Sequence, residues 1–323
     1  MKKLWCVFPV LLLFLLPASS VIAQSYPERP VRMVLTMPPG PSLDTISRMI
    51  AAKLTQAWKQ PVIVENRPGA GGNIGATAVV RSEPDGYTFL VATTGSAISP
   101  SIYRKLPYDP FKDLVPVSQI YKLSFVMAVN PGVPAKTVSE LVAYAKANPG
   151  RLNYASSGAG GTPHLAAELF KSLTGTDIAH IPYKGVAPMN IALITNQVQV
   201  VFVTIQGAVP LIKAGKMRAL AVTGQNRSAL LPNVPTLVEA GLRGYELPNW
   251  IGMYAPAGTP PEIVAKLHAE LARILAMPDV RNYILNGGNE IVGSSPAEFA
   301  ATYKADVAKF ARIIKDANIP QQD

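Results

Sequence analysis

The chain has 323 residues, a length typical of two domains, with 49% hydrophobic and 15% charged residues. This balance excludes an intrinsically disordered chain, which combines low hydrophobicity with high net charge. The formal charge of +10 is scattered, without runs of Lys or Arg, so we expect no nucleic-acid partner and a general preference for anions.

The first 23 residues have the pattern of a secretory signal peptide. Two lysines precede an apolar run from Leu4 to Leu16, which is shorter than the roughly 20 residues that span a bilayer. Small residues lead up to Ala23, so we predict export with cleavage near this residue. Cys6, the only cysteine, lies inside this segment, and we therefore expect a mature chain without a disulfide or a cysteine metal ligand.

The remaining chain alternates short apolar strands with amphipathic helices. In chain order, strands are predicted at 31–36, 62–65, 88–92, 124–129, 152–155, 178–181, 199–203 and 219–222, and helices at 42–58, 73–81, 138–147, 162–173, 261–276 and 296–317. Repeated strand–helix units predict an α/β fold whose sheets are doubly wound, mainly parallel and covered by helices on both faces.

Two blocks of these units predict two lobes. The first lobe comprises residues 24–123 and 248–323, and the second comprises residues 124–247. The chain then crosses between the lobes near Leu123 and near Leu247, and two crossings make a natural hinge. A cleft between two lobes is a preferred place for a small ligand.

Side chains for catalysis or metal binding are scarce. His164 and Glu168 lie four residues apart on a predicted helix, a spacing that suits two metal ligands or an ordinary first helical turn. No third ligand is visible nearby, and no serine or threonine has an evident base beside it. We therefore expect no catalytic residue, no metal and no cofactor.

A glycine-rich segment at residues 67–75 follows a predicted strand and opens a helix, as a dinucleotide-binding loop does. Its spacing is GxGxxxG rather than GxGxxG, and the expected acidic residue would be Asp85, which lies in a tight turn rather than at a strand end. A helix entry that needs positive φ and close packing explains these glycines better.

Polar turns of small residues recur between a strand and a helix N-terminus. In a doubly wound sheet such turns lie at the carboxyl ends of the strands, where ligands bind. Helix N-termini offer unpaired N–H groups and a partial positive charge, which suit a carboxylate or a phosphate. The sequence therefore predicts an anion site built from four turns, at residues 36–45, 93–96, 156–162 and 204–206.

Short motifs along the mature chain form a recognisable set. They include Pro38-Pro39-Gly40, Val64-Glu65-Asn66-Arg67-Pro68-Gly69-Ala70-Gly71-Gly72-Asn73-Ile74-Gly75, Pro84-Asp85-Gly86-Tyr87-Thr88, Leu152-Asn153-Tyr154-Ala155-Ser156, His180-Ile181-Pro182-Tyr183-Lys184-Gly185 and Ala255-Pro256-Ala257-Gly258-Thr259-Pro260. Together they resemble the Bug family, the substrate receptors of tripartite tricarboxylate transporters. The resemblance covers essentially the whole mature chain.

The resemblance implies a two-lobed periplasmic-binding-protein fold of type II that closes on its ligand. It implies a periplasmic receptor, expected to be a monomer, that captures a small carboxylate for the membrane subunits of a transporter. Members of the family hold carboxylates through backbone amides, hydroxyls and ordered water. The ligand-binding residues predicted here are Met37, Pro39, Gly40, Asp44, Thr93, Thr94, Ser96, Ser156, Ser157, Gly158, Thr162, Gly185, Thr204 and Gln206.

Three residues depart from the family pattern. Pro41 stands where relatives usually have a second glycine, Val203 where they commonly have an aspartate, and Val186 where they have a smaller residue. An aspartate is a natural partner for a ligand ammonium group, so Val203 disfavours an amino acid. These departures predict a more apolar pocket, suited to an aliphatic or aromatic mono- or dicarboxylate.

Other functions stay open at this point. A ligand sensor that feeds a membrane signalling system has the same sequence features as a transport receptor. An exported α/β enzyme would be distinguished by a nucleophile and a base that converge in the cleft. A nucleotide-binding protein is a further alternative, which binding of a nicotinamide cofactor would reveal.

Overall fold

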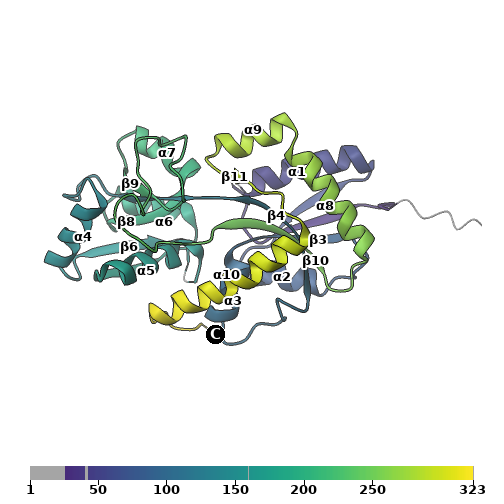
Figure 1. The fold of residues 1–323 in the computed structure, drawn as a ribbon, viewed down its shortest axis with the longest axis horizontal. Coiled ribbons are helices and arrows are strands. Elements are labelled where there is room, and N and C mark those ends of the chain that lie inside the picture. The colour runs from purple at the N-terminus through teal and green to yellow at the C-terminus, as the bar shows by residue number, and fades with distance from the viewer. Residues whose placement is uncertain (1–25, 41–42, 159, 323) are drawn as a thin grey trace, which may run out of the picture.

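The computed structural model describes residues 26–40, 43–158 and 160–322. The predicted signal peptide, its cleavage point at Ala23 and Pro41 lie outside these residues. Two sheets form the two halves of an elongated molecule (Figure 1). No helix of the described part is both long enough and apolar enough to cross a membrane.

The first half is built on a mixed sheet. Its strands are β1 (Val31–Leu35), β2 (Val62–Asn66), β3 (Thr88–Thr93), β4 (Leu114–Lys122), β10 (Trp250–Pro256) and β11 (Glu290–Ile291). They lie in the order β11-β4-β10-β3-β1-β2. β1 pairs in parallel with β2 and β3, which places the carboxyl ends of these three strands at one edge.

The second half repeats this plan with a smaller sheet. Its strands are β5 (Phe125–Val129), β6 (Leu152–Ser156), β7 (Ile178–Pro182), β8 (Val200–Thr204) and β9 (Arg218–Val222). They lie in the order β7-β6-β8-β5-β9, and β6 pairs in parallel with β7 and β8. β6 therefore has the same place in the second sheet as β1 has in the first.

The predicted α/β class with two sheets is confirmed, but the sheets are mixed rather than mainly parallel. β10 runs antiparallel to β3 and β4, and β5 runs antiparallel to β8 and β9. The physical reason is that β5 and β10 enter their sheets directly from the other half, without the crossover helix that a parallel connection requires.

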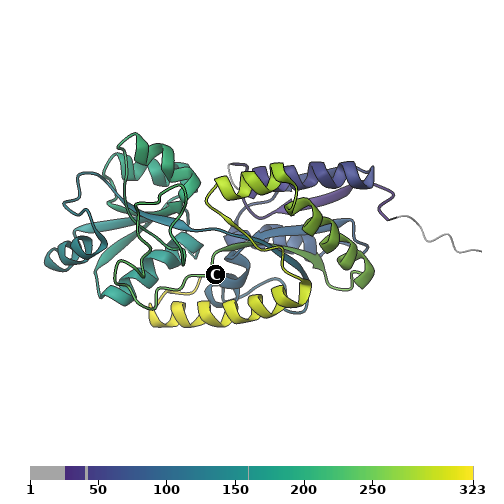
Figure 2. The same cartoon turned by 45° about the horizontal axis from the view of Figure 1, so that its top comes forward.

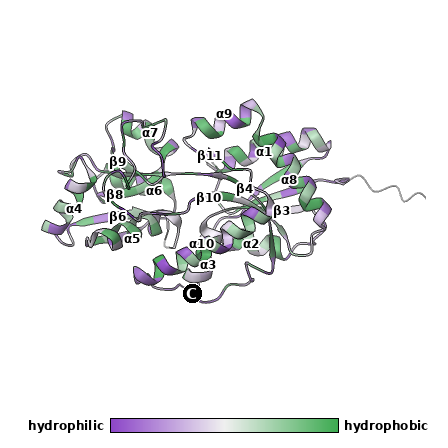
Figure 3. Ribbon diagram, viewed as in Figure 1, coloured by the Kyte–Doolittle hydropathy of each residue, from purple (hydrophilic) through white to green (hydrophobic). Residues whose placement is uncertain are grey.

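Helices cover both faces of each sheet (Figure 2). In the first half these are α1 (Leu43–Trp58), α2 (Asn73–Val80), α3 (Gly95–Ile102), α8 (Pro261–Leu275), α9 (Pro278–Asn286) and α10 (Pro296–Asp316), and in the second half α4 (Val138–Ala147), α5 (Thr162–Thr174), α6 (Val186–Ile194) and α7 (Ile205–Lys213). The strands are mostly apolar, whereas most helices alternate apolar and polar residues (Figure 3). This pattern buries one stripe of each helix against a sheet.

The apolar core follows these layers. One cluster lies under α1, α8 and α9, and another lies under α6 and α7. A third cluster extends from the α2 and α3 face of the first sheet into the α5 face of the second, and α10 contributes to it. This continuous cluster ties the two halves together along one side.

The chain passes between the halves at the β4–β5 link and again just before β10. The Leu123 N–H donates to the Asn249 carbonyl oxygen at 3.0 Å, so the two connections are hydrogen-bonded to each other. The Trp250 indole N–H donates to Asp306 Oδ2 on α10 at 2.7 Å. Burial raises the pKa of Asp306. The hydrogen bond from Trp250 and the positive charges of Lys309 and Lys122 lower this pKa and partly offset the effect of burial. The division of the lobes at residues 123 and 247 stays a prediction.

Candidate functional site

The segments that follow β1, β2 and β3 lie against each other at one edge of the first sheet. An added Cβ atom on Gly72, at the start of α2, would lie 3.0 Å from the Cβ of Thr36. An added Cβ atom on Gly95, at the start of α3, would lie 2.8 Å from the Gly71 carbonyl oxygen. Gly71 and Gly72 also have positive φ angles of 65° and 102°. Close packing of helices therefore accounts for these glycines.

The turn after β1 is held from the neighbouring strand and from the following helix. Asn66, at the end of β2, donates its side-chain N–H groups to the Met37 carbonyl oxygen at 3.0 Å and to Asp44 Oδ1 at 2.9 Å. Arg48 Nε donates to Asp44 Oδ2 at 3.1 Å. Met37 is partly buried, whereas Pro39 is exposed and Gly40 is half-buried.

The Asp44 carboxylate is engaged inside the first half. Its side chain is buried, in the first turn of α1. Burial alone would raise the pKa of Asp44, but hydrogen bonds from Arg48 and Asn66 hold this pKa below its ordinary value. Asp44 is therefore ionised and paired, and it positions the turn rather than offering a free charge to a ligand.

The turn after β3 is fastened to β10. The Trp250 N–H donates to the Thr94 hydroxyl at 2.8 Å, and Thr94 is fully buried. The Gly95 N–H donates to Thr93 Oγ1 at 3.1 Å. Ser96 Oγ donates to the Thr93 carbonyl oxygen at 3.1 Å. The predicted residues Thr93, Thr94 and Ser96 are thus brought together, and their side chains fix the start of α3 beside the start of β10.

The turn after β6 rests on a serine and a histidine. Ser156 is buried, and its hydroxyl donates to the Gly158 carbonyl oxygen at 2.9 Å and accepts the Gly158 N–H at 3.2 Å. His180 Nε2, from β7, lies 2.7 Å from Ser156 Oγ. Ser157 is half-buried. The predicted residues Ser156, Ser157 and Gly158 therefore form one local unit.

His164 holds the same turn from the helix that follows it. The Gly160 N–H donates to His164 Nδ1 at 3.0 Å. The His164 and His180 rings stack with centroids 4.1 Å apart and planes 13° apart, and Tyr154 stacks on His180 at 4.8 Å. From the sequence, His164 was interpreted either as a metal ligand or as an ordinary helical residue, and its pairing with His180 was not predicted. Only the β6–β7 register reveals this pairing. Among the described residues, no group of His, Cys, Asp and Glu is arranged to hold a metal ion.

The remaining predicted residues lie after β7 and β8 and at the start of α5. Gly185, with a φ of 108°, precedes α6, and Thr162 is buried at the first position of α5. Thr204 ends β8, and Gln206 Oε1 in the first turn of α7 is buried without a hydrogen-bond partner among the described residues. These residues end up at the carboxyl edge of the second sheet, as predicted for parallel strands.

Two of the departures noted in the sequence have different surroundings. Val186 is 39% exposed at the start of α6. Val203 is 2% exposed and packs in the core under α6 and α7. The side chain of Val203 is therefore a core side chain, and an argument about ligand charge cannot rest on it.

The helix N-termini at the two carboxyl edges lack side-chain caps. α2, α3, α5, α6 and α7 begin without a side-chain cap hydrogen bond in the described structure. Elsewhere, Thr137 caps α4 and Ser295 caps α10 through a capping box, whereas α8 and α9 also begin without a side-chain cap. The Gly95 N–H of α3 is taken by Thr93 Oγ1, but the five helices at the carboxyl edges still direct their positive dipole ends and their remaining first-turn N–H groups to these edges, where an anion can satisfy them.

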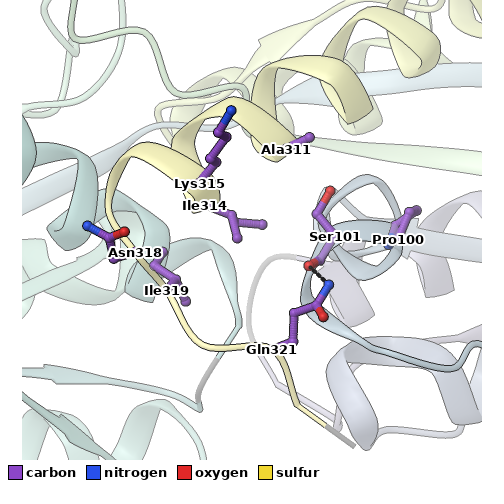
Figure 4. Close-up of a pocket in the computed structure, with 8 residues that line it drawn as sticks. All are labelled: Pro100, Ser101, Ala311, Ile314, Lys315, Asn318, Ile319 and Gln321. Atoms are coloured by element: carbon purple, nitrogen blue, oxygen red, sulfur yellow. Dashed lines mark hydrogen bonds between the residues drawn. The ribbon is translucent and has the colours of Figure 1, made fainter.

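A pocket of about 590 Å³ lies elsewhere, between α3 and the segment after α10 (Figure 4). Ile314, Ile319 and Gln321 line it, and Gln321 Nε2 donates to the Ser101 carbonyl oxygen at 3.3 Å. None of the predicted ligand residues lines this pocket. The C-terminal segment forms part of the pocket wall, and the pocket is separate from the four predicted turns.

Comparison with known proteins gives a consistent family. The model of the tripartite tricarboxylate transporter family receptor matches residues 46–319. Protein BugT of Bordetella pertussis (strain Tohama I) is 33% identical over 301 residues, covering 93% of this chain and 92% of BugT. A UPF0065 protein of Pseudomonas sp. (strain P51), from the tcbD-tcbE intergenic region, is 35% identical over 300 residues, covering 92% and 89%.

Solved structures agree with this match. The structure of R. palustris Rpa4515 with adipate has a TM-score of 0.86 at 36% identity and covers 92% of this chain and 100% of that chain. MatC from Rhodopseudomonas palustris with bound malate has a TM-score of 0.81 at 31% identity and covers 90% and 100%. The periplasmic binding protein BugD has a TM-score of 0.83 at 33% identity and covers 92% and 100%. These likenesses confirm the Bug-family resemblance and the periplasmic-binding-protein fold.

Proposed function

Because the chain belongs to the tripartite tricarboxylate transporter receptor family, we propose that it is a periplasmic receptor for a small mono- or dicarboxylate. The ligand lies between the two carboxyl edges, and the two halves close on it. The loaded receptor then delivers it to the membrane subunits of a transporter. The observation that carries the proposal is the set of uncapped helix N-termini at both edges.

The chemistry of these edges favours a carboxylate over a cation or a sugar. Hydroxyls and backbone N–H groups dominate the turns, and uncapped helix N-termini stabilise negative charge. Rpa4515 holds adipate and MatC holds malate in their structures, so two relatives of the same fold take dicarboxylates. Without Lys2 and Lys3 of the predicted signal peptide, 28 Lys and Arg against 20 Asp and Glu leave a formal net charge of +8, which adds a general attraction for anions.

The ligand is an aliphatic or aromatic acid without an amino group. The only carboxylate among the predicted ligand residues is Asp44, and Arg48 and Asn66 already neutralise and hydrogen-bond it. An ammonium group would therefore lose its water without gaining an ionised partner at these turns. The exposed Val186 at the start of α6 adds an apolar surface.

One contact bears on the enzyme alternative. Ser156 Oγ and His180 Nε2 lie 2.7 Å apart, as a nucleophile and its base do. Ser156 is fully buried, however, and its hydroxyl is taken up by both backbone groups of Gly158. A hydroxyl in these surroundings supports the turn and does not reach a substrate. We therefore propose that the protein binds its ligand without converting it chemically.

A thermal-shift screen tests the proposal on mature protein that has been refolded to remove co-purified ligand. Adipate, malate and aromatic acids are compared with amino acids of matched length. A ligand at 100 times its dissociation constant stabilises the fold by about 2.7 kcal/mol, which is a shift of a few degrees. Shifts with amino acids, sugars or nucleotides but with no simple acid would contradict the proposed ligand class.

A pair of threonine variants locates the site. Thr162 begins α5 at the carboxyl edge, whereas Thr137 caps α4, which follows the antiparallel strand β5. We expect Thr162→Ala to weaken binding of the acid found in the screen by about fivefold, because one buried hydroxyl donor is lost. Thr137→Ala should cost about 1 kcal/mol of stability and leave affinity unchanged. Equal affinities for both variants and the wild type would move the site away from α5.

A further inference from the structure

We propose that His164 and His180 are positioning residues that keep Gly158 and Gly160 in the ligand-receptive arrangement by remaining uncharged. The inference rests on the proposed carboxylate site and deepens it. The two histidines come from α5 and β7, on either side of the turn after β6. Neither is itself required to touch the ligand.

The two histidine rings belong to a stack of three rings. Tyr154, His180 and His164 lie nearly parallel, with 15° between Tyr154 and His180 and 13° between the two histidines. Neutral aromatic rings stack favourably at such spacings. Two imidazolium ions with centroids 4.1 Å apart would repel each other in a buried site. The stack therefore excludes a doubly protonated pair.

Hydrogen bonds fix the orientation of each histidine ring. His164 Nδ1 accepts the Gly160 N–H at 3.0 Å, so its proton must be on Nε2. The Ser156 hydroxyl donates to the Gly158 carbonyl oxygen, and its oxygen accepts both the Gly158 N–H and the His180 Nε2–H. A proton on His164 Nδ1 would face the Gly160 N–H and break that bond.

The surroundings of the two rings favour their uncharged forms. Glu168 and Lys171 on α5 and Tyr154 on β6 are the charged and titratable groups beside them, and Tyr154 Oη and Lys171 Nζ both donate to Glu168 Oε1, at 2.5 and 2.7 Å. Burial, then His180 and Lys171, lower the pKa of His164 to about 3. Burial also lowers the pKa of His180; Glu168 opposes this effect and Lys171 adds to it.

The turn after β6 packs closely against residues of the first half. Gly160 has a φ of 75°, and an added Cβ atom there would lie 2.9 Å from Ile102 Cγ2 and 3.4 Å from Gln322 Nε2. Both of these neighbours are uncharged and belong to the first half. His164 thus holds the point at which the turn of the second half meets the first half. Release of Gly160 would disturb both the turn and this contact.

The test compares two substitutions at one position, with adipate and malate as calorimetric probes at pH 7. His164→Phe keeps an aromatic ring in the stack and removes the acceptor for Gly160. His164→Asn keeps an acceptor close to the place of Nδ1. We expect the Phe variant to bind about tenfold more weakly and the Asn variant to stay within about threefold of the wild type. Equal losses in both variants would overturn the proposal, because a purely structural role predicts no rescue.

A second measurement needs neither a ligand nor a variant. Long-range nitrogen–proton NMR of the imidazoles reports the protonation and tautomer of each histidine. We expect His164 to stay neutral with its proton on Nε2 from pH 7.5 to about 4.5. A titration near 6.5, or the opposite tautomer, would overturn the proposal even if the Phe variant failed to fold. If neither acid binds the wild type while the tautomer is as expected, the proposed ligand class fails and the positioning of the turn stands.

Discussion

The turn after β1 and the turn after β6 have equivalent places in their sheets, but different kinds of side chain hold them. Each turn is supported by one residue from the adjacent parallel strand and one from the first turn of the following helix. In the first sheet these are Asn66 and Asp44, and in the second they are His180 and His164. One turn therefore depends on an ionised carboxylate, and the other depends on two uncharged rings.

The comparison teaches that a turn can be fixed in two ways without placing a free charge at the ligand edge. The Asp44 pKa is held below its ordinary value of 3.8, so this support is present above that value and is lost as the pH falls through the lower folded value. The His164 pKa is lowered from 6.5 to about 3, so its support is present above 6.5 and is lost as the pH falls toward 3. The two turns thus respond to acid in different windows.

The largest expected effect is the acid response of the second turn. In the wild type, the unfolded chain binds a proton on His164 below pH 6.5 while the folded chain does not, which lowers stability by up to about 1.4 kcal/mol per pH unit. Urea unfolding at pH 7 and pH 4.5 should show the wild type losing about 2.5 kcal/mol more than His164→Asn does. An identical pH dependence of both proteins would show that His164 titrates normally and would remove the contrast between the turns.

A smaller effect is expected from the amide that holds the first turn. Asn66→Ala removes the hydrogen bonds to the Met37 carbonyl oxygen and to Asp44, and also the exposed bond from Arg48 Nη2 to Asn66 Oδ1, so we expect a loss of about 1–2 kcal/mol in urea unfolding at pH 7. Asn148→Ala is the matched control, because the Asn148 amide makes a single local bond to the Tyr144 carbonyl oxygen at the end of α4. If the two variants lose the same stability, Asn66 is an ordinary surface amide and not the support of the turn.

Much of the fold could be predicted from periodicity, because most strands and helices carry a clear apolar pattern. The helix predicted at 42–58 is α1, and the one predicted at 296–317 ends one residue earlier as α10. α3 was missed because Gly95, Pro100 and its serines are poor helix formers, and the helix exists because Ile98 and Ile102 are buried against the core. β4 was missed because Pro116 interrupts its pattern.

The site was predictable in its turns but not in its supports. The turn residues lie at strand ends, as the rule for parallel sheets requires. Asp44 and Asn66 are 22 positions apart, and Ser156 and His180 are 24 apart, so no local spacing reveals either pair. The strand order β2-β1-β3 and its counterpart β7-β6-β8 make these pairs neighbours. His164 looked like an ordinary helical residue because its stacking partner, His180, is on strand β7, 16 positions along the chain.

The smallest expected effect separates the charge from the amide in the first turn. Arg48 is half exposed, and an ion pair of this kind contributes below about 1 kcal/mol, since water screens it and the long side chain must be ordered. In Arg48→Met, Asn66 still donates to Asp44 Oδ1, so the turn should keep its conformation. Arg273→Met is the matched control, because Arg273 pairs with Glu270 within α8 at a similar exposure and makes no bond to the turn residues. Urea unfolding at low and high salt measures both variants. A loss above about 2 kcal/mol for Arg48→Met alone would mean that the cation itself holds the turn after β1. The difference between the two turns would then be that an ion pair holds the first and a neutral ring stack holds the second.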